Sequence, residues 1–218
     1  FTFVHMDPRY FFPTGSMQAA GGALDWFERL LRGEADGKLY DELSEAASRS
    51  PVGSSGLLFL PYLIGERSPF WNPHARGAFV GLSMAHGRPE TVRAVLEGVA
   101  FNLALIVDAF QSQGAAISAI RLIGGGARLA VWRQILADVY GLPVVLPALL
   151  SEATSLGAAI AGGVGVGLYR DYTVAQRFVQ VRAGEQPEPA RVQQYRALRG
   201  LFEETYRALL PVYEKLAR

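Results

Sequence analysis

Three consecutive glycines, at positions 124–126, stand between an apolar strand and an amphipathic helix in the stretch LIGGGARLAVWRQILADVYGLPVVLP. Without a Cβ, a glycine can adopt a positive φ and lets a ligand such as a flat base or a ribose approach the main chain directly. The start of the following helix presents free N–H groups and a positive dipole end, which favour a nearby phosphate. A strand, a glycine turn and a helix start are the parts of a nucleotide site at the carboxyl end of a parallel sheet.

Other interpretations of these glycines are less specific or fail in detail. A glycine run after a strand can simply form a tight turn. A dinucleotide fingerprint fits Gly124 and Gly126, but Leu129 occupies the place of its third glycine. Further on, Leu146 and Pro147 stand where that fingerprint needs an acidic residue. No G-x-x-x-x-G-K-S/T pattern occurs in the sequence, which excludes a P-loop.

The elements that would position the glycines form a βαβ unit. Residues 119–124 and 143–147 are predicted strands, and residues 128–141 between them are a predicted helix. Strands joined in this way are nearly always parallel, with a right-handed crossover. The helix has apolar residues every three or four positions, and its expected buried face consists of Leu129, Trp132, Leu136 and Val139.

Periodicity and turn residues predict further elements on both sides of this unit. The other predicted strands are 1–7, 9–15, 57–63 and 77–83, of which the first two should pair antiparallel. The other predicted helices are 17–33, 38–50, 89–114, 151–167 and the C-terminal tail 190–218.

Individual residues set the expected limits of these helices. Ser16 is placed to cap the helix 17–33 and Gly33 to end it. The buried face of that helix is expected to hold Leu24, Phe27 and Leu31. The tail is expected to be either a helical hairpin or one long helix kinked at its proline, Pro211.

Composition indicates one globular domain. The chain has 218 residues, of which 50% are hydrophobic and 19% charged, and its net charge of +1 comes from interspersed charges. We therefore expect neither nucleic acid nor a membrane surface as a partner. The most apolar stretch, residues 156–169, is shorter than the roughly 20 residues of a membrane span and is predicted to be a buried helix and loop. The lack of cysteine is consistent with a cytoplasmic location.

Four motifs in order resemble the C-terminal domain of the FGGY carbohydrate kinases, most closely the xylulokinase branch. They are FLPYLIGERSPFWNPHARGAFVGL, VLEGVAFNLA, IGGGARLAVWRQILADVYGLPV and EATSLGAAIAG. The resemblance covers nearly the whole chain and implies that residues 1–218 form one C-terminal, nucleotide-binding domain. It implies an α/β fold of the actin-like ATPase, ribonuclease-H-like type, with a mixed sheet and helices on both faces. It also implies ATP-dependent phosphorylation of a sugar, with Mg²⁺ bound alongside the nucleotide.

The resemblance also assigns residues to the nucleotide. The adenosine motif of the family falls on Gly124, Gly125, Gly126 and Ala127, which should pack against the base and the ribose. A helix near the start of the domain also touches the nucleotide in the family's glycerol kinases. The segment AGGALDW is similar to that helix and points to Gly21 and Asp25.

Two groups of residues have weaker assignments. In the motif GERSPFWNP, Glu66 and Arg67 either form a pair that orders the loop or line a cleft entrance near the sugar. The three histidines are scattered without metal-ligand spacing, so we expect neither a metal site nor a histidine base from them: His5, His74 and His86.

The resemblance also implies parts that this sequence does not contain. The family's aspartate base and its phosphate-gripping turn match nothing here, so we predict no catalytic residue in the chain, which should begin in the middle of a longer protein. The hypothesis is that the chain is the ATP- and ADP-binding half of a kinase for a pentulose, and the resemblance points to D-xylulose. The alternatives are an inactive actin-like regulatory or interaction domain and, more weakly, a nicotinamide-dependent enzyme. Without its other half, the chain is expected to expose apolar surface and form a homodimer.

Overall fold

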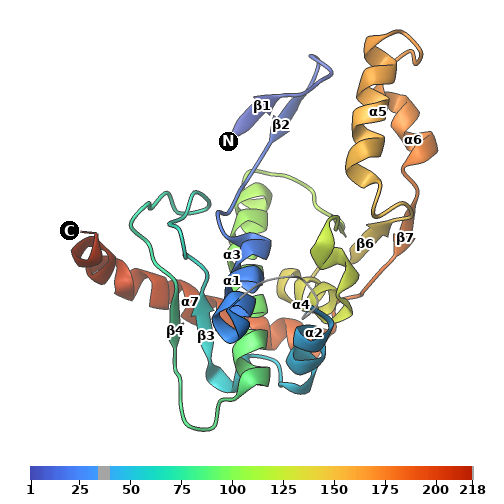
Figure 1. Ribbon diagram of the computed structural model, residues 1–218. Helices are drawn as coiled ribbons and strands as arrows, with labels where there is room; N and C mark the ends of the chain where they lie inside the picture. The colour runs from blue at the N-terminus through green and yellow to red at the C-terminus, as the bar shows by residue number, and fades with distance from the viewer. Residues whose placement is uncertain (34–39, 218) are drawn as a thin grey trace.

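The structure is a computed structural model that describes residues 1–33 and 40–217 (Figure 1). The strands in this part of the chain are β1 (Thr2–Val4), β2 (Phe11–Pro13), β3 (Leu58–Leu60), β4 (Ala78–Val80), β5 (Ile120–Arg121), β6 (Val144–Pro147) and β7 (Val181–Ala183). The α-helices are α1 (Ala20–Arg32), α2 (Tyr40–Arg49), α3 (Arg88–Ser112), α4 (Ala130–Tyr140), α5 (Ala153–Gly165), α6 (Ala175–Phe178) and α7 (Pro189–Leu216). Short 3-10 helices are η1 (Ser54–Gly56), η2 (Gly125–Arg128) and η3 (Tyr172–Val174).

The predicted βαβ unit is present. β5 and β6 are parallel, with Ile120 opposite Val144, and α4 connects them. β7 pairs antiparallel with the other edge of β6, so this three-stranded sheet is mixed. The residues expected on the buried face of the connecting helix are indeed buried: Leu129, Trp132, Leu136 and Val139.

The remaining strands form two small antiparallel sheets. β1 pairs with β2 as predicted, with Phe3 opposite Phe12, and Figure 1 shows this hairpin projecting away from the helices. β3 pairs with β4, with Phe59 opposite Phe79. The observed strands are shorter than the predicted ones; β3, for example, ends at Leu60, directly before a proline that cannot donate to a ladder.

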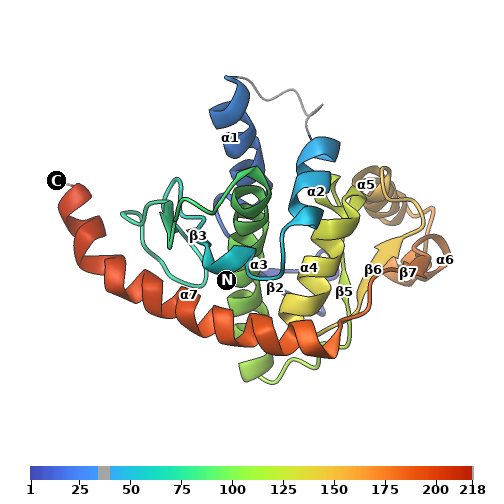
Figure 2. The same cartoon turned by 90° about the horizontal axis from the view of Figure 1, so that it is seen from below.

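Helix α3 is the centre of the core. Figure 2 shows it between α1, α2 and α4, with α7 lying across one side of the molecule. It begins at Arg88, and its first turn is capped by Glu90, whose Oε2 accepts a hydrogen bond of 2.9 Å from the N–H of Gly87. Every residue from 92 to 102 is buried, as expected for a helix packed on all sides.

Gly98 allows α3 to approach strand β3 closely. A Cβ at this position would overlap the carbonyl oxygen of Phe59 and lie 3.0 Å from its carbonyl carbon. Because both groups belong to the main chain, neither can move aside by a change of rotamer. The glycine therefore fixes the distance between the central helix and the sheet.

Replacement of Gly98 by alanine is expected to lower the free energy of unfolding by about 1–3 kcal/mol, the usual effect of overpacking a core. Urea unfolding of the protein measures this change. The matched control is Gly200→Ala on the exposed face of α7, where a Cβ meets nothing within 4 Å. That control should stabilise the protein by up to about 1 kcal/mol through helix propensity alone. Equal midpoints for Gly98→Ala and the wild type would contradict the proposed close contact.

The N-terminal limit predicted for the first helix is wrong. α1 begins at Ala20, and Ser16 does not cap it. The reason is that the N–H of Gln18 donates to Oε1 of Glu66 at 3.0 Å, which holds the chain before the helix in a different direction. Gly33 ends the helix as predicted, with a φ of 83°. Leu31 is 45% exposed, contrary to prediction, because the last turn of α1 extends beyond the core (Figure 2).

The predicted burial of the apolar stretch 156–169 is also wrong. In α5 only Ile160 and Gly163 are buried within the described residues. Figure 1 shows α5 and α6 projecting from the body of the molecule, and the ring of Tyr169 covers Gly163. Gly157 has nothing within 4 Å of its Cβ position, so this glycine does not mediate close packing. The apolar composition of α5 is therefore not matched by packing partners in this part of the chain.

The C-terminal tail is one long helix. α7 continues through Pro211 to Leu216, which corresponds to the second of the two predicted arrangements. Its inward side contributes Tyr195, Phe202, Tyr206 and Tyr213 to the core. The predicted helix 38–50 corresponds to α2, and its first two residues lie outside the described residues.

Candidate functional site

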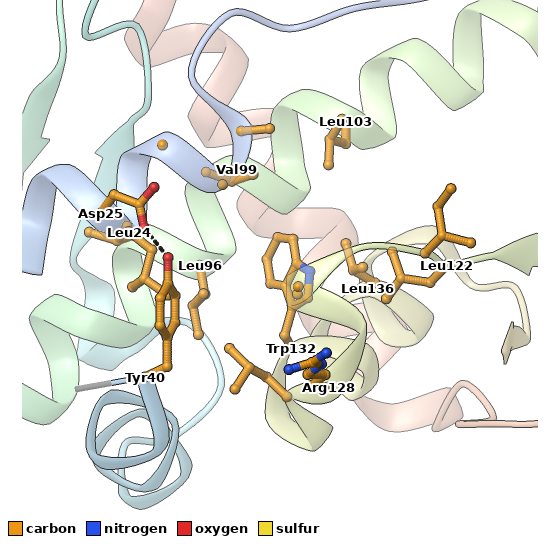
Figure 3. Close-up of a pocket in the computed structure, with 18 of the residues that line it drawn as sticks. Leu24, Asp25, Tyr40, Leu96, Val99, Leu103, Leu122, Arg128, Trp132 and Leu136 are labelled. Atoms are coloured by element: carbon orange, nitrogen blue, oxygen red, sulfur yellow. Dashed lines mark hydrogen bonds between the residues drawn. The ribbon is translucent and has the colours of Figure 1, made fainter. Parts of the chain in front are cut away.

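A cavity of about 780 Å³ lies between helices α1, α2 and α3 on one side and β5, η2 and α4 on the other. We call it the interhelical cavity (Figure 3). Its volume falls in the range of small-molecule sites, roughly 300–1,000 Å³. Most of its wall is apolar, and this part includes Leu24, Leu96, Val99, Leu103, Leu122, Trp132 and Leu136.

The three glycines after β5 have three different roles. Gly124 has φ 84° and ψ −174°, a conformation essentially restricted to glycine, and so makes the turn. Gly125 lines the cavity with nothing within 4 Å of its Cβ position. Gly126 also lines the cavity, but its Cβ position is 3.0 Å from Nε1 of Trp132, so this glycine provides room for the indole ring. Bare main chain therefore faces open space mainly at Gly125.

The chain does not pass directly from the glycines into the predicted helix. Residues 125–128 form the 3-10 helix η2, Leu129 is extended, and α4 begins at Ala130. The N–H of Leu129 donates to the carbonyl of Gly126. This N–H, at the start of the helix, is therefore not free to bind an anion. The cavity wall at this point is thus a tight turn followed by a helix.

The structure brings four of the six predicted nucleotide residues to the cavity wall. Gly21 and Asp25 lie there on α1, opposite Gly125 and Gly126. Gly124 is not among the residues that line the cavity. Ala127 is 1% exposed, and its carbonyl accepts a hydrogen bond of 2.9 Å from Nη1 of Arg133.

Tyr40 is a cavity residue that the sequence did not reveal. It lies at the start of α2, and its hydroxyl donates to Oδ1 of Asp25 on α1 (Figure 3). Burial, and then the nearby Asp25 carboxylate, raise the pKa of the Tyr40 hydroxyl above its usual value. The hydroxyl therefore keeps its proton at neutral pH and remains a donor. A tyrosine at the start of a polar helix gives no local signal of a contact fifteen positions upstream.

The charged residues of the cavity wall are divided between its two sides. Asp25 and the exposed Asp41 belong to the side formed by α1 and α2. Arg128 belongs to the side formed by η2, and its Nη2 donates weakly to Oγ of Ser151 at 3.3 Å. Between them the wall is apolar. The arrangement can hold a flat apolar ligand that carries a hydrogen-bond donor at one end and negative charge at the other.

Glu66 orders its loop, although not through an ion pair with the Arg67 guanidinium. The carboxylate is buried and accepts hydrogen bonds from the N–H groups of Gln18 and Arg67 and from Nδ2 of Asn102, at 3.0, 2.7 and 2.9 Å. The Arg67 guanidinium instead lies over the ring of Phe1, 5.3 Å from its centre. Burial raises the pKa of Glu66 above its usual value. Glu66 therefore connects α3, its own loop and the segment before α1.

Neither a metal-binding group nor a membrane span is found in residues 1–33 and 40–217. This part of the chain contains no group of three or more His, Asp or Glu residues that could hold a metal ion. None of its helices has both the length and the apolar character needed to cross a membrane.

Comparison with known proteins gives a family match. Residues 2–166 match the family described as the C-terminal domain of the FGGY family of carbohydrate kinases. The xylulose kinase of Bacillus subtilis (strain 168) is 32% identical over 205 residues, which are 94% of this chain and 40% of that protein. The gluconokinase of Bacillus licheniformis is 38% identical over 179 residues, 82% of this chain and 35% of that protein.

A solved structure agrees with these matches. The ligand-bound xylulose kinase of Lactobacillus acidophilus superposes with a TM-score of 0.81 and 32% identity, over 92% of this chain and 40% of that one. The chain thus spans about 40% of the length of the xylulose kinases that it matches. With an actin-like ATPase fold and a family match over most of its residues, the chain belongs to the FGGY family of carbohydrate kinases and corresponds to their C-terminal domain.

Proposed function

We propose that this chain is the nucleotide-binding part of a longer ATP-dependent carbohydrate kinase. The observation that carries the proposal is the bare main chain of Gly125, which borders the interhelical cavity with nothing within 4 Å of its Cβ position. Gly21 and Asp25 border the same cavity from α1, so both segments assigned to the nucleotide by family resemblance meet there. The adenine and ribose would pack against Gly125, between the two sides of the cavity.

The proposed reaction transfers the γ-phosphoryl group of ATP to a sugar hydroxyl. The bond from phosphorus to the ADP oxygen breaks as the bond to the sugar oxygen forms, and the hydroxyl proton passes to a base. We assign that base to an aspartate outside this chain. Mg²⁺ is usually held through nucleotide phosphates and one or two carboxylates. We assign to this chain the binding and orientation of the nucleotide, because Gly21, Asp25 and Gly125 border one cavity.

D-xylulose is the proposed acceptor, which would give D-xylulose 5-phosphate. The xylulose kinases of Bacillus subtilis and Lactobacillus acidophilus support this choice, since they match over 94% and 92% of the chain. Gluconate is the second candidate because the gluconokinase of Bacillus licheniformis has the higher identity, 38%. We place the kinase in the cytoplasm, together with its ATP and sugar.

A sugar panel tests the proposed reaction. The full-length protein is incubated with ATP, Mg²⁺ and D-xylulose, D-ribulose, glycerol or D-gluconate, and ADP release is measured. We expect kcat/KM for D-xylulose to be at least about tenfold higher than for the other three, a difference of about 1.4 kcal/mol in the transition state. A preference for D-gluconate would select the second candidate. Absence of turnover with every sugar would contradict the kinase proposal.

Calorimetry separates the kinase from the two other classes of function. The proposed site should bind ATP and ADP but not NAD. An actin-like interaction domain without kinase activity would give no turnover in the sugar panel. If it also lacks an open nucleotide site, calorimetry would detect no binding of ATP or ADP. Binding of NAD in preference to ATP would favour the nicotinamide-dependent alternative.

A further inference from the structure

The side of the interhelical cavity formed by α1 and α2 offers a distinctive set of polar groups. Asp25 is half-buried on α1, and its Oδ1 accepts the hydrogen bond from the Tyr40 hydroxyl. No other hydrogen bond to this carboxylate is recorded within residues 1–33 and 40–217, and Figure 3 shows its second oxygen clear of Tyr40. An ionised carboxylate has only acceptor sites, about four in all. A ligand that fits this end of the cavity therefore needs a hydrogen-bond donor that faces Asp25.

The walls next to this pair favour a flat ring. Leu96 and Val99 on α3 and the indole of Trp132 on α4 line the space beside Asp25 and Tyr40 (Figure 3). Leu96 and Val99 have no polar side-chain atom, and the indole Nε1 of Trp132 lies beside Gly126. None of the three therefore donates a hydrogen bond to the Asp25 carboxylate. Once a ligand displaces water from this half-buried carboxylate, an oxygen left without a donor is unfavourable, the more so because it is charged. A ligand that brings a donor to Asp25 avoids this loss.

We propose that Asp25, held in place by Tyr40, accepts a hydrogen bond from the exocyclic 6-amino group of adenine and so selects adenine nucleotides. The proposal rests on the proposed nucleotide-binding function and specifies which part of the nucleotide the α1–α2 side reads. Asp25 is the specificity-determining residue because it contacts the base. Tyr40 is a positioning residue because it acts through the carboxylate.

The chemistry of the bases explains the selection. In the same pose, a purine with hydrogen at position 6 leaves the carboxylate unpaired. Guanine places its O6 acceptor against it, and two acceptors repel each other. Asp41 borders the same side, but it is exposed, so water already satisfies its carboxylate. Asp41 should therefore not contribute to the preference between bases.

The test measures how Asp25 and the 6-amino group depend on each other. Calorimetry gives the Kd values of the full-length protein for ATP, for purine riboside 5′-triphosphate, which lacks the amino group, and for GTP, all without sugar. The wild type should bind ATP at least about tenfold more tightly than either analogue, since a hydrogen bond to a charged group is stronger than one between neutral groups. In Asp25→Ala the preference for ATP over the 6-hydrogen analogue should fall to about twofold or less.

Further variants separate this role from a structural one. Asp25→Asn keeps the shape of the side chain and should reduce the preference for ATP over GTP, because its amide can donate to O6. Tyr40→Phe should weaken ATP binding several-fold and keep the order of the three ligands. Asp41→Asn should leave the ratio of ATP to analogue affinity unchanged. Thermal unfolding of each variant establishes that it is folded.

The possible failures have different signatures. If Asp25→Ala and Asp25→Asn weaken ATP and the 6-hydrogen analogue by the same factor, the base-reading role is overturned and the nucleotide site remains. If the wild type binds ATP and both analogues equally, the same conclusion holds. If the wild type binds no nucleotide at all, the proposed function itself fails.

Discussion

Replacement of Glu97 by alanine is expected to lower the free energy of unfolding by about 3–5 kcal/mol, as is usual when one partner of a buried ion pair is removed. Glu97 is buried in the middle of α3. Its Oε1 accepts hydrogen bonds from Nε of Arg93 and the hydroxyl of Tyr195, both at 2.7 Å, and from the N–H of Gly53 at 3.0 Å. Its Oε2 accepts from Oγ of Ser54 at 2.8 Å.

The effect should be large because the partners of Glu97 are themselves buried. Arg93 also donates to the carbonyls of Ala47 and Ser50 at the end of α2, and to the oxygen of Tyr195 at 2.8 Å. The network therefore connects α2, η1 and α7 to the central helix. Without Glu97, the Arg93 guanidinium would remain buried without a counter-charge.

Chemical denaturation measures the loss, and two control variants calibrate it. Tyr195→Phe removes only the hydroxyl and should lower the stability by about 1–3 kcal/mol, because it leaves polar neighbours unpaired. Glu45→Ala breaks the exposed pair between Arg49 and Glu45 and should change the stability by less than about 1 kcal/mol. A loss below about 1 kcal/mol for Glu97→Ala would show that the network does not hold these elements together.

The sequence predicted those features that depend on local periodicity. Leu129, Trp132, Leu136 and Val139 recur at helical spacing because one face of α4 packs on the core, and all four are buried. Turn residues were similarly informative, since Gly33 ends α1 with a positive φ. Local backbone geometry therefore explains why the βαβ unit and the glycine turn could be found without a structure.

Contacts between distant segments could not be predicted in this way. Tyr195 meets Glu97 from 98 positions away, and neither residue breaks the pattern of its own helix. The pairing of Tyr40 with Asp25 is likewise invisible to periodicity, although Asp25 itself was a candidate. Composition misled in the opposite direction for α5, whose apolar residues predicted burial, while only Ile160 and Gly163 are buried in the described part of the chain. Burial depends on which partners the rest of the chain supplies.

The second large effect is expected at the glycine loop. Gly125→Leu in the full-length protein should weaken ATP binding by about 100-fold or more, roughly 2.7 kcal/mol, because the side chain would occupy the space where the base and ribose meet the main chain. Nothing lies within 4 Å of the Cβ position, and the φ of Gly125 is not positive. The free energy of unfolding should therefore change by no more than about 0.5 kcal/mol. Calorimetry with ATP and chemical denaturation measure the two quantities.

Gly125→Ala should have a smaller effect on ATP binding than Gly125→Leu, because only a methyl group enters the cavity. The matched control is Gly200→Leu on α7, where a Cβ likewise meets nothing within 4 Å but the cavity is remote. It should leave the Kd for ATP unchanged. This pair of leucine variants separates a local block from a general effect of added apolar surface.

The neighbouring glycines make the test more specific, because they should respond differently. Gly124→Ala forces a side chain into the glycine-only conformation and should lower the free energy of unfolding by about 1–3 kcal/mol. Gly126→Ala should displace the Trp132 indole, which lies 3.0 Å from the Cβ position, and so alter the cavity wall. Only at Gly125 should binding be lost without a loss of stability. If folded Gly125→Leu binds ATP within about threefold of the wild type, the nucleotide does not approach this loop, and the proposed site is wrong.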